Sequence, residues 1–362
     1  MPTVADVLRQ YGGEYLERFG ARMPNEQRKV LRVIMGCRTG QLGTIHYQCV
    51  SCGRTHVMGR SCGNRHCPSC QQFKAKAWLQ KQTARLLPCP YFLITFTVPA
   101  ELRQFVRSHP KESYDAMFEA SSGALKKLAA DPKYIGSKKP GFLGVLHSWS
   151  RALGFHPHIH YVVPGGGLSD DGGTWLPSRA DFFVPVKALS PIYRAKFRDA
   201  MKRAGLFQQI DPAVWRREWV VDSQAVGDGR SSLKYLAPYV FRVAISDRRI
   251  LSYDDGRVTF SYRKSHTNRW RKMTLNAMEF MRRFLQHVLP TGFMKIRHYG
   301  FLSPNSREPI EAVRWLVALH YDLVFLLLAV IKKDLLPQRV RCAKCGGVMT
   351  LIAFTPPCRG PP

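Results

Sequence analysis

The stretch that decides the fold reads Gly154-Phe-His-Pro-His-Ile-His-Tyr-Val-Val163. Its second half alternates histidine with apolar residues, a pattern typical of a β-strand. Residues two apart on a strand face the same side of a sheet, so His158 and His160 are expected to lie side by side, with Ile159 facing a core. Two adjacent imidazoles suit a divalent cation that would polarise a phosphodiester. Because proline cannot donate in a central ladder, the strand proper is predicted to begin near His158.

A third ligand for this cation has two candidates. His147 lies on the preceding candidate strand, Gly144 to Ser150, and His156 lies just before the predicted start of the histidine strand. Imidazole pairs generally favour zinc, whereas phosphoryl chemistry usually recruits Mg²⁺ or Mn²⁺. For this chemistry we expect Mg²⁺ or Mn²⁺ as the catalytic ion.

A pair of tyrosines follows about 75 residues later, in Lys234-Tyr235-Leu-Ala-Pro-Tyr239. Positions four apart share one face of a helix, so both phenols are expected at one site. A tyrosine can attack a phosphodiester and store the bond as a phosphotyrosine ester. Its phenol, with an ordinary pKa of about 10, would need help in ionising from the metal or from Lys234. Pro238 disfavours helical geometry, which predicts either a kink or a helix that begins after Tyr235.

Two C-x2-C pairs, Cys49-Val-Ser-Cys52 and Cys67-Pro-Ser-Cys70, stand 14 residues apart. Each such turn points two thiolates at one tetrahedral cation, so Cys49, Cys52, Cys67 and Cys70 are predicted to bind a structural Zn²⁺ as a zinc ribbon. The alternative donors, for this ion or for a second one, are Cys37, Cys62 and His66.

Near the C-terminal end, Cys342-Ala-Lys-Cys345 is another knuckle, but only Cys358 follows it. Two cysteines are half of a tetrahedral zinc site. We therefore expect either that this segment folds only in part or that the other zinc ligands come from elsewhere in the chain.

The chain carries 55 Lys and Arg against 25 Asp and Glu, a formal charge of +30 over 362 residues. Such a charge attracts a polyanion, which favours nucleic acid as the partner. No acidic residue lies between Glu26 and Glu101, and Glu279 is the only one from Arg257 to Arg307. The candidate DNA contacts within or near these blocks are Arg60, Arg65, Lys74, Lys76, Lys234, Arg263, Lys264 and Arg269.

Strand-like and helix-like segments alternate unevenly, which predicts an α+β fold. Strands are expected at Tyr91–Val98, 144–150 and 158–163, and helices around 191–205, 276–288 and 309–336. The apolar stretch from Val324 to Ile331 is too short to cross a membrane, and the first residues contain no secretory signal. Three regions are expected: a helical and zinc-binding domain at 1–88, a catalytic domain at 89–300, and a helical extension with half a zinc knuckle at 301–362.

These elements, in this order, resemble the HUH (His, hydrophobic, His) rolling-circle transposases of bacterial insertion sequences. That group combines a zinc-binding N-terminal domain with a two-tyrosine catalytic domain. The resemblance covers roughly residues 5–305 and rests on five segments, which are 49–70, 91–99, 156–168, 235–246 and 297–301.

The resemblance implies an enzyme that nicks one DNA strand, keeps the 5′ phosphate on tyrosine, frees a 3′ hydroxyl and later rejoins ends. His158 and His160 would be the metal ligands and Tyr235 and Tyr239 the nucleophile pair. The fold implied is a central antiparallel sheet with packed helices, as in HUH endonucleases, preceded by a small zinc-ribbon domain. The segment Tyr91–Val98 would be the other central strand. The substrate would be single-stranded element ends, in the bacterial cytoplasm at the nucleoid and with no membrane contact.

Three alternatives remain at this level. A plasmid rolling-circle replication initiator would share the same chemistry. A noncatalytic zinc-ribbon nucleic-acid-binding protein would need only the charge and the knuckles. An inactive remnant of a transposase would keep the motifs without the activity.

Overall fold

The computed structural model describes residues 2–241, 244–264, 267, 269–323 and 340–357, and the side chains of 72–73, 238–239 and 241 are outside this description. The apolar stretch at 324–331, which falls in the helix expected around 309–336, and Cys358 therefore lie outside the described residues. Backbone contacts divide the chain into one unit of Met1–Gln72, Ile245–Val288 and Val330–Pro362 and a second of Phe73–Ala244 and Leu289–Ala329. These units interleave along the chain, whereas the three regions expected from the sequence are consecutive. No helix among the described residues has the length and apolar character needed to span a membrane.

The second unit is built on a five-stranded sheet in which every neighbouring pair is antiparallel. Its order is β13 (Ile296–Tyr299), β5 (Phe142–Trp149), β6 (Phe155–Pro164), β3 (Tyr91–Thr97) and β9 (Val221–Ala225). The strands rich in β-branched and aromatic residues occupy the middle, as expected for a buried sheet. The mixed fold class with antiparallel sheets and the strand at 91–98 are confirmed.

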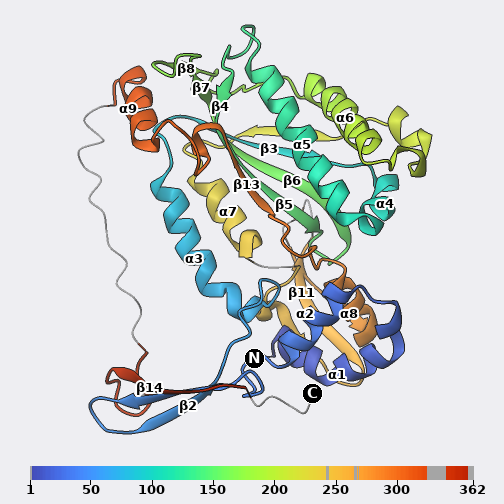
Figure 1. The fold of residues 1–362 in the computed structure, drawn as a ribbon, viewed down its shortest axis with the longest axis vertical. Helices are drawn as coiled ribbons and strands as arrows, with labels where there is room; N and C mark the ends of the chain where they lie inside the picture. Colours follow the sequence, from blue (N-terminus) through green and yellow to red (C-terminus); the bar gives the residue numbers. More distant parts are fainter. Residues whose placement is uncertain (1, 242–243, 265–266, 268, 324–339, 358–362) are drawn as a thin grey trace. The chain divides into compact units, whose positions relative to one another are not determined.

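One face of this sheet packs on two helices, α5 (Pro110–Ala129) and α6 (Val186–Arg203) (Figure 1). Ile159 and Tyr161 of β6 are fully buried there and belong to the same apolar cluster as α5 and α6 residues. Because side chains alternate along a strand, Ile159 fills the core while its neighbours His158 and His160 face the other way.

The histidine-bearing face is covered by α7 (Arg230–Phe241), by α9 (Ile310–His320) and by the C-terminal part of α3 (Pro68–Ala84) (Figure 1). Leu233 and Leu236 of α7 form one apolar cluster with sheet residues such as Val145 and Val162. The packing of α7 on this face fixes the position of the helix that carries the tyrosines.

The expectation for Pro157 is corrected, and of the two alternatives for Pro238 the later helix start is excluded. The strand β6 begins at Phe155, so Pro157 lies within it rather than before it. The ladder with β5 shifts register between His147 and Trp149, where two residues of β6 oppose one of β5, so Pro157 sits at a bulge that tolerates a missing donor. The helix α7 begins at Arg230 and continues past Pro238, which places Tyr235 inside the helix and not before it.

Three further strands in the second unit form a small antiparallel sheet, β4 (Lys139–Pro140), β7 (Gly166–Leu168) and β8 (Trp175–Pro177). The glycines of β7 are required because there is no room for a side chain at Gly166 and Gly167. A Cβ on Gly167 would lie 2.2 Å from Ser137 Oγ, so this run is a close-packed turn and strand.

Among the described residues, the first unit includes the helices α1 (Val4–Phe19), α2 (Asn25–Met35) and α8 (Ala277–Leu285), together with two small sheets. One sheet is the meander β10 (Ile250–Ser252), β11 (Arg257–Arg263) and β12 (Trp270–Asn276). Its Phe260 packs against Phe280 of α8. The other sheet has the order β14 (Met349–Thr355), β1 (Thr44–Cys49) and β2 (Thr55–Gly59).

Candidate active site and metal centres

Three histidines from two neighbouring strands converge on one face of the five-stranded sheet. His147 of β5 stands opposite His158 of β6, and His160 lies two residues further along β6. The ring centroids are 5.1 Å apart for His147 and His158, 4.7 Å for His147 and His160, and 4.8 Å for His158 and His160. One ring nitrogen of each lies within 4.8 Å of the others. This spacing fits three ligands of a single cation.

Hydrogen bonds orient two of these rings. His158 Nδ1–H donates to the backbone carbonyl of His156 at 2.7 Å, which leaves the lone pair of its Nε2 available. Thr95 Oγ1 lies 2.8 Å from His160 Nδ1. Among the described residues, the buried Nε2 of His160 has no hydrogen-bond partner. In metal-bound histidines, the nitrogen that does not bind the metal commonly makes a hydrogen bond of the kind seen here at Nδ1 of His158 and His160.

Burial keeps the three rings neutral. Desolvation lowers the pKa of His158 to about 4 and holds those of His147 and His160 well below the ordinary value. The positive charge that one ring would carry also opposes protonation of the others. Neutral imidazole is the form that binds a metal, so the donor set is ready for a cation at neutral pH.

The two candidate third ligands are placed differently. His147 is in the group of three, whereas His156 is not, although its ring lies 5.0 Å from that of His158. His156 contributes through its backbone carbonyl instead. The structure therefore brings His147 to His158 and His160, as the register of β5 and β6 requires.

Tyr235 projects from α7 toward the same cluster. Its ring centroid is 5.9 Å from that of His160, at an interplanar angle of 86°. Its side chain is 42% exposed, so a large substrate can reach the phenol. Lys234 is exposed beside it. Tyr239 lies one turn further along α7, but its side chain is outside the described residues.

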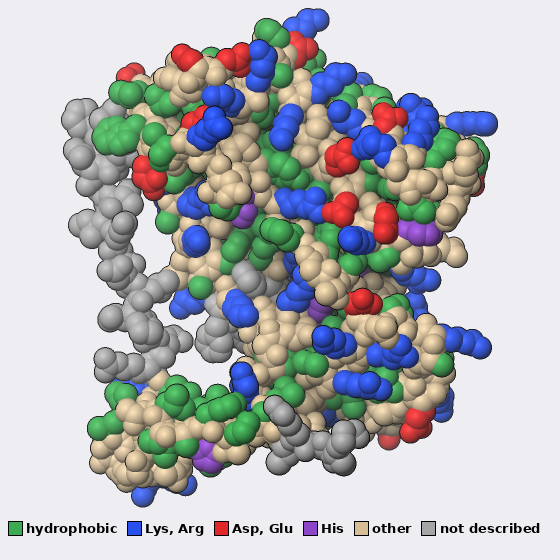
Figure 2. Space-filling view, viewed as in Figure 1, with side chains coloured by type: hydrophobic (Ala, Val, Ile, Leu, Met, Phe, Trp, Pro, Cys, Tyr) green, Lys and Arg blue, Asp and Glu red, His purple; other side chains and the backbone are tan. Residues whose placement is uncertain are grey.

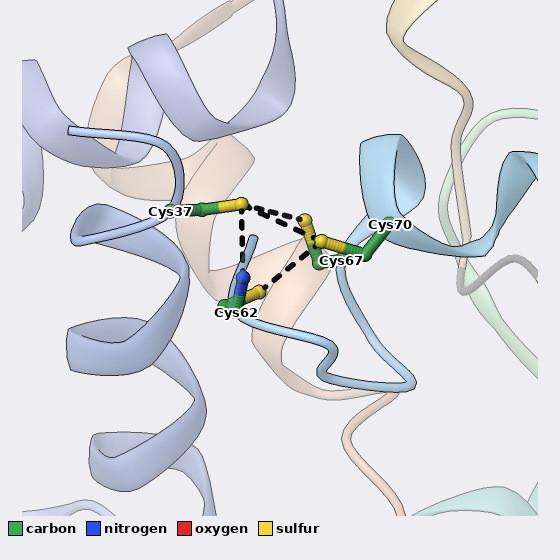
Figure 3. A group of neighbouring side chains, drawn as sticks. All are labelled: Cys37, Cys62, Cys67 and Cys70. Atoms are coloured by element: carbon green, nitrogen blue, oxygen red, sulfur yellow. Dashed lines mark hydrogen bonds between the residues drawn. The ribbon is translucent and has the colours of Figure 1, made fainter. Parts of the chain in front are cut away.

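Four cysteines of the first unit form a compact group of sulfur atoms, Cys37, Cys62, Cys67 and Cys70 (Figure 3). Cys37 follows α2, Cys62 lies in the loop after β2, and the other two lie at the start of α3. The Sγ of Cys70 is 3.5 Å from those of Cys37 and Cys62, and the Sγ atoms of Cys67 and Cys37 are 3.9 Å apart. Four sulfurs at these separations fit a tetrahedral zinc ion.

The thiols of this cluster shift one another's pKa values. A hydrogen bond with Cys37 lowers the pKa of Cys70, and the same neighbour raises the pKa of Cys67. A divalent cation among the four sulfurs would favour the thiolate form of every one.

The predicted grouping of the zinc ligands is corrected by these positions. Cys49 and Cys52 do not join Cys67 and Cys70; their sulfurs are grouped with those of Cys342 and Cys345. The reason is topological, because β1 pairs with β14 and carries its knuckle to the C-terminal one. Of the alternative donors, Cys37 and Cys62 complete the first group, and His66 is in neither group.

The candidate DNA-binding side chains are exposed, and Lys and Arg outnumber acidic groups on the visible surface of both units (Figure 2). Arg263, Lys264 and Arg269 flank the tip of the β11–β12 hairpin, where the Arg263 guanidinium lies 5.1 Å from the Trp270 ring centroid. The other exposed members are Arg60, Arg65, Lys74, Lys76 and Lys234.

Sequence reasoning missed Thr95 as part of the site. The signal was present, since Thr95 and Thr97 are polar positions on one face of an otherwise apolar strand. In the β3–β6 ladder, Thr95 stands opposite His160 and Thr97 stands opposite His158, so both polar positions lie on the face that carries the histidines.

Comparison with known proteins identifies the family of the chain. Residues 7–98 match the family described as "Transposase zinc-binding domain", and residues 141–309 match the family described as "Putative transposase". The chain is 37% identical over 327 residues, 85% of its length and 82% of the relative, to "Putative transposase y4qJ" of Sinorhizobium fredii. It is 29% identical over 295 residues, 75% of its length and 68% of the relative, to "Transposase for insertion sequence element IS801" of Pseudomonas savastanoi pv. phaseolicola. No solved structure matches the chain significantly.

The chain is thus a transposase with a zinc-binding domain. The chain belongs to the IS91 family of insertion-sequence transposases. The first cysteine group lies entirely within the zinc-binding region, which supports a structural zinc ion held by Cys37, Cys62, Cys67 and Cys70. Both relatives are named transposases, so neither gives support to a plasmid initiator.

Proposed function

We propose that this chain is a metal-dependent tyrosine DNA nickase and strand transferase that acts on single-stranded element ends during rolling-circle transposition. The observation that carries the proposal is the position of Tyr235, whose ring lies beside that of His160. His160 is one of the three neutral histidines of the cluster. Family membership supports DNA as the substrate. The net charge of +30 supports it independently.

The antiparallel sheet supports an HUH-type catalytic domain. In this arrangement the His-x-His strand β6 lies in the middle of the sheet and the tyrosine helix α7 packs on its histidine face. The proposed ligands of the catalytic cation are His147, His158 and His160. Three imidazoles fit a transition-metal ion better than Mg²⁺, which prefers oxygen ligands, so Mn²⁺ is the better candidate of the two metals expected. When bound, the cation would polarise the scissile phosphodiester and offset charge on its oxygens.

The reaction proposed for Tyr235 is a reversible transesterification. The Tyr235 phenol oxygen attacks phosphorus, the bond from phosphorus to the 3′ oxygen breaks, and the 5′ phosphate stays on Tyr235 as an ester. The phenol loses its proton and the departing 3′ oxygen gains one, so the products are a phosphotyrosine and a 3′ hydroxyl. In the reverse direction, a 3′ hydroxyl attacks the phosphotyrosine, and two DNA ends are joined without an external energy source. Tyr239, one helical turn later, is the proposed second nucleophile.

Cationic side chains position the strand. Lys234 is exposed next to Tyr235 and is proposed to contact the phosphate backbone. The cation of Arg263 and the exposed indole of Trp270 offer a stacking platform for an unpaired base at the β11–β12 hairpin. Arg60, Arg65, Lys74 and Lys76 are proposed as further backbone contacts.

A covalent-adduct assay tests the proposal. Labelled single-stranded oligonucleotides tiled across the DNA that flanks the gene are incubated with the full chain and Mn²⁺, then separated on denaturing gels. We expect one end sequence to become attached to the protein. The double variant Tyr235→Phe with Tyr239→Phe should form no adduct, whereas Tyr253→Phe, in the other unit, should form it at the wild-type level. An adduct that survives in the double variant would contradict the assignment of the nucleophile.

A second arm separates catalysis from binding. If the chain were a noncatalytic binding protein, it would retain the oligonucleotides in a gel shift but would cleave none of them with any divalent ion. The single variants then assign the tyrosines, because the one that attacks first is required for the initial nick.

A further inference from the structure

The C-terminal segment of the described chain folds onto the N-terminal part of the first unit (Figure 1). The strand β14 pairs antiparallel with β1, from Thr44 opposite Thr355 to Cys49 opposite Met349. Val50 N–H donates to the Val348 carbonyl at 3.0 Å just beyond this ladder. The pairing brings two cysteine knuckles together that are almost 300 residues apart in the sequence.

The two knuckles have the same backbone construction. In the first, Gly53 N–H donates to the Cys49 carbonyl at 3.0 Å, and in the second, Gly346 N–H donates to the Cys342 carbonyl at 2.9 Å. Both glycines have positive φ, +68° and +72°, a conformation that other residues rarely adopt.

A second hydrogen bond is also shared. Cys49 N–H donates to the Arg54 carbonyl at 2.9 Å, and Cys342 N–H donates to the Gly347 carbonyl at 2.8 Å. The equivalence means that each C-x2-C-G turn is already shaped as a metal knuckle.

The sulfur atoms of the two knuckles lie at the spacing of a metal site. The Sγ atoms of Cys49 and Cys345 are 3.5 Å apart, those of Cys52 and Cys342 are 3.8 Å apart, and all four lie within 4.8 Å of one another. Zinc–sulfur bonds of about 2.3 Å in a tetrahedron place the sulfurs about 3.8 Å apart. Gly347 packs closely here, since a Cβ on it would lie 3.1 Å from Cys49 Sγ.

The surroundings suit thiolates. Backbone N–H groups of Ser51 and Cys52 point at Cys49 Sγ, and those of Lys344 and Cys345 point at Cys342 Sγ. Four thiolates on one Zn²⁺ leave a net negative charge, and cationic side chains lie in or beside both knuckles. These are Arg54, Arg341 and Lys344.

We propose that Cys49, Cys52, Cys342 and Cys345 bind a second structural zinc ion, which fastens the C-terminal segment to the N-terminal zinc-binding domain. Two of its ligands lie outside both matched regions, 7–98 and 141–309. On binding, four thiols lose their protons and four Zn–S bonds form. The ion closes a loop of nearly the whole catalytic chain, a constraint that disfavours the unfolded state.

Thiolate-bound metal per chain is the direct test. Full-length protein is purified with zinc, exchanged into Co²⁺, and measured by the sulfur-to-cobalt charge-transfer absorption, which histidine ligands do not produce. The wild type should bind two thiolate-ligated ions. Cys342→Ser with Cys345→Ser should bind one, as should Cys37→Ser with Cys62→Ser. Cys89→Ala, a change at a buried cysteine outside both groups, should keep two.

Other results would overturn the proposal. A single ribbon of Cys49, Cys52, Cys67 and Cys70 would give one ion in the wild type and one in the Cys342→Ser, Cys345→Ser variant. A disulfide within the C-terminal group would likewise leave a single thiolate site, and mass spectrometry would detect it as a loss of two hydrogens.

Hydrogen exchange gives a readout that is independent of metal content. In the Cys342→Ser, Cys345→Ser variant, the amides of β1 should lose protection while those of β3 in the second unit keep it. Unchanged protection of β1 would show that the C-terminal segment does not depend on this metal site. Neither measurement depends on DNA cleavage, so both test the second zinc site independently of the proposed transposase mechanism.

Discussion

Thr95 and His160 stand opposite each other on β3 and β6, with Thr95 Oγ1 2.8 Å from His160 Nδ1. This contact holds the ring so that its buried Nε2 points into the histidine cluster. In the proposed mechanism Thr95 is therefore a positioning residue that acts through His160.

Replacing Thr95 by valine should weaken metal binding without removing a ligand. The change keeps the side-chain shape but deletes the hydrogen bond, and loss of such an outer partner typically costs about 10-fold to 100-fold in affinity. The Mn²⁺ concentration for half-maximal adduct formation should rise by about tenfold, and saturating Mn²⁺ should restore the rate. Thr97→Val, two residues along the same strand, is the matched control. Equal shifts in both variants would refute the role of Thr95.

The stability of the second unit should fall in acid through its buried histidines. The ordinary pKa is 6.5 and burial lowers that of His158 to about 4, so the unfolded chain binds protons more readily than the folded one between these values. Stability is therefore present in full above pH 6.5 and is lost as the pH falls through about 4. The shift corresponds to on the order of 3 kcal/mol.

Urea unfolding at pH 7.5 and pH 5, without added Mn²⁺, measures this dependence. His158→Gln cannot titrate and should lose less stability than the wild type over the same interval. His320→Gln, at an exposed position of α9, should behave as the wild type. Parallel curves for all three proteins would show that folding does not lower the pKa of His158.

The β11–β12 hairpin should contribute to the salt dependence of DNA binding. Combined Arg263→Ala, Lys264→Ala and Arg269→Ala should lower affinity for single strands and reduce the slope of log affinity against log salt by about 0.7 for each phosphate that is no longer neutralised. The control removes Lys187, Lys202 and Arg203 of α6, so that net charge changes equally. A similar decrease of slope in both triple variants would mean that binding follows total charge and not this hairpin.

Two glycine substitutions should change the free energy of unfolding in opposite directions. Gly144 of β5 stands opposite Tyr161, and a Cβ there would lie 2.6 Å from the buried Tyr161 ring. Gly144→Ala should therefore destabilise the chain by about 1–3 kcal/mol. Gly13 lies on the exposed side of α1 with nothing within 4 Å of an added Cβ, so Gly13→Ala should stabilise it by up to about 1 kcal/mol. Thermal and urea unfolding measure both changes.

Local pattern predicted much of the geometry of the candidate site. Alternation along 158–163 indicated which face His158 and His160 share, and strand register then placed His147 against them. It also predicted a knuckle at every C-x2-C pair. It could not predict which knuckles meet, because that depends on how β1 finds β14 across the whole chain. Pro157 misled for a related reason, since the bulge between β5 and β6 tolerates a proline inside the strand. For Pro238, the start of α7 at Arg230 excludes a helix that begins after Tyr235.

The partnership of β1 with β14 also orders events during synthesis. The ribosome releases β1 early, whereas the strand that covers its outer edge is made almost 300 residues later, roughly 15 to 60 seconds at usual elongation rates. During that interval the edge of β1 and the thiols of Cys49 and Cys52 lack their final neighbours. A prematurely terminated chain would carry every residue proposed for nicking and still lack the strand that pairs with β1, so the first unit is complete only after β14 has been translated.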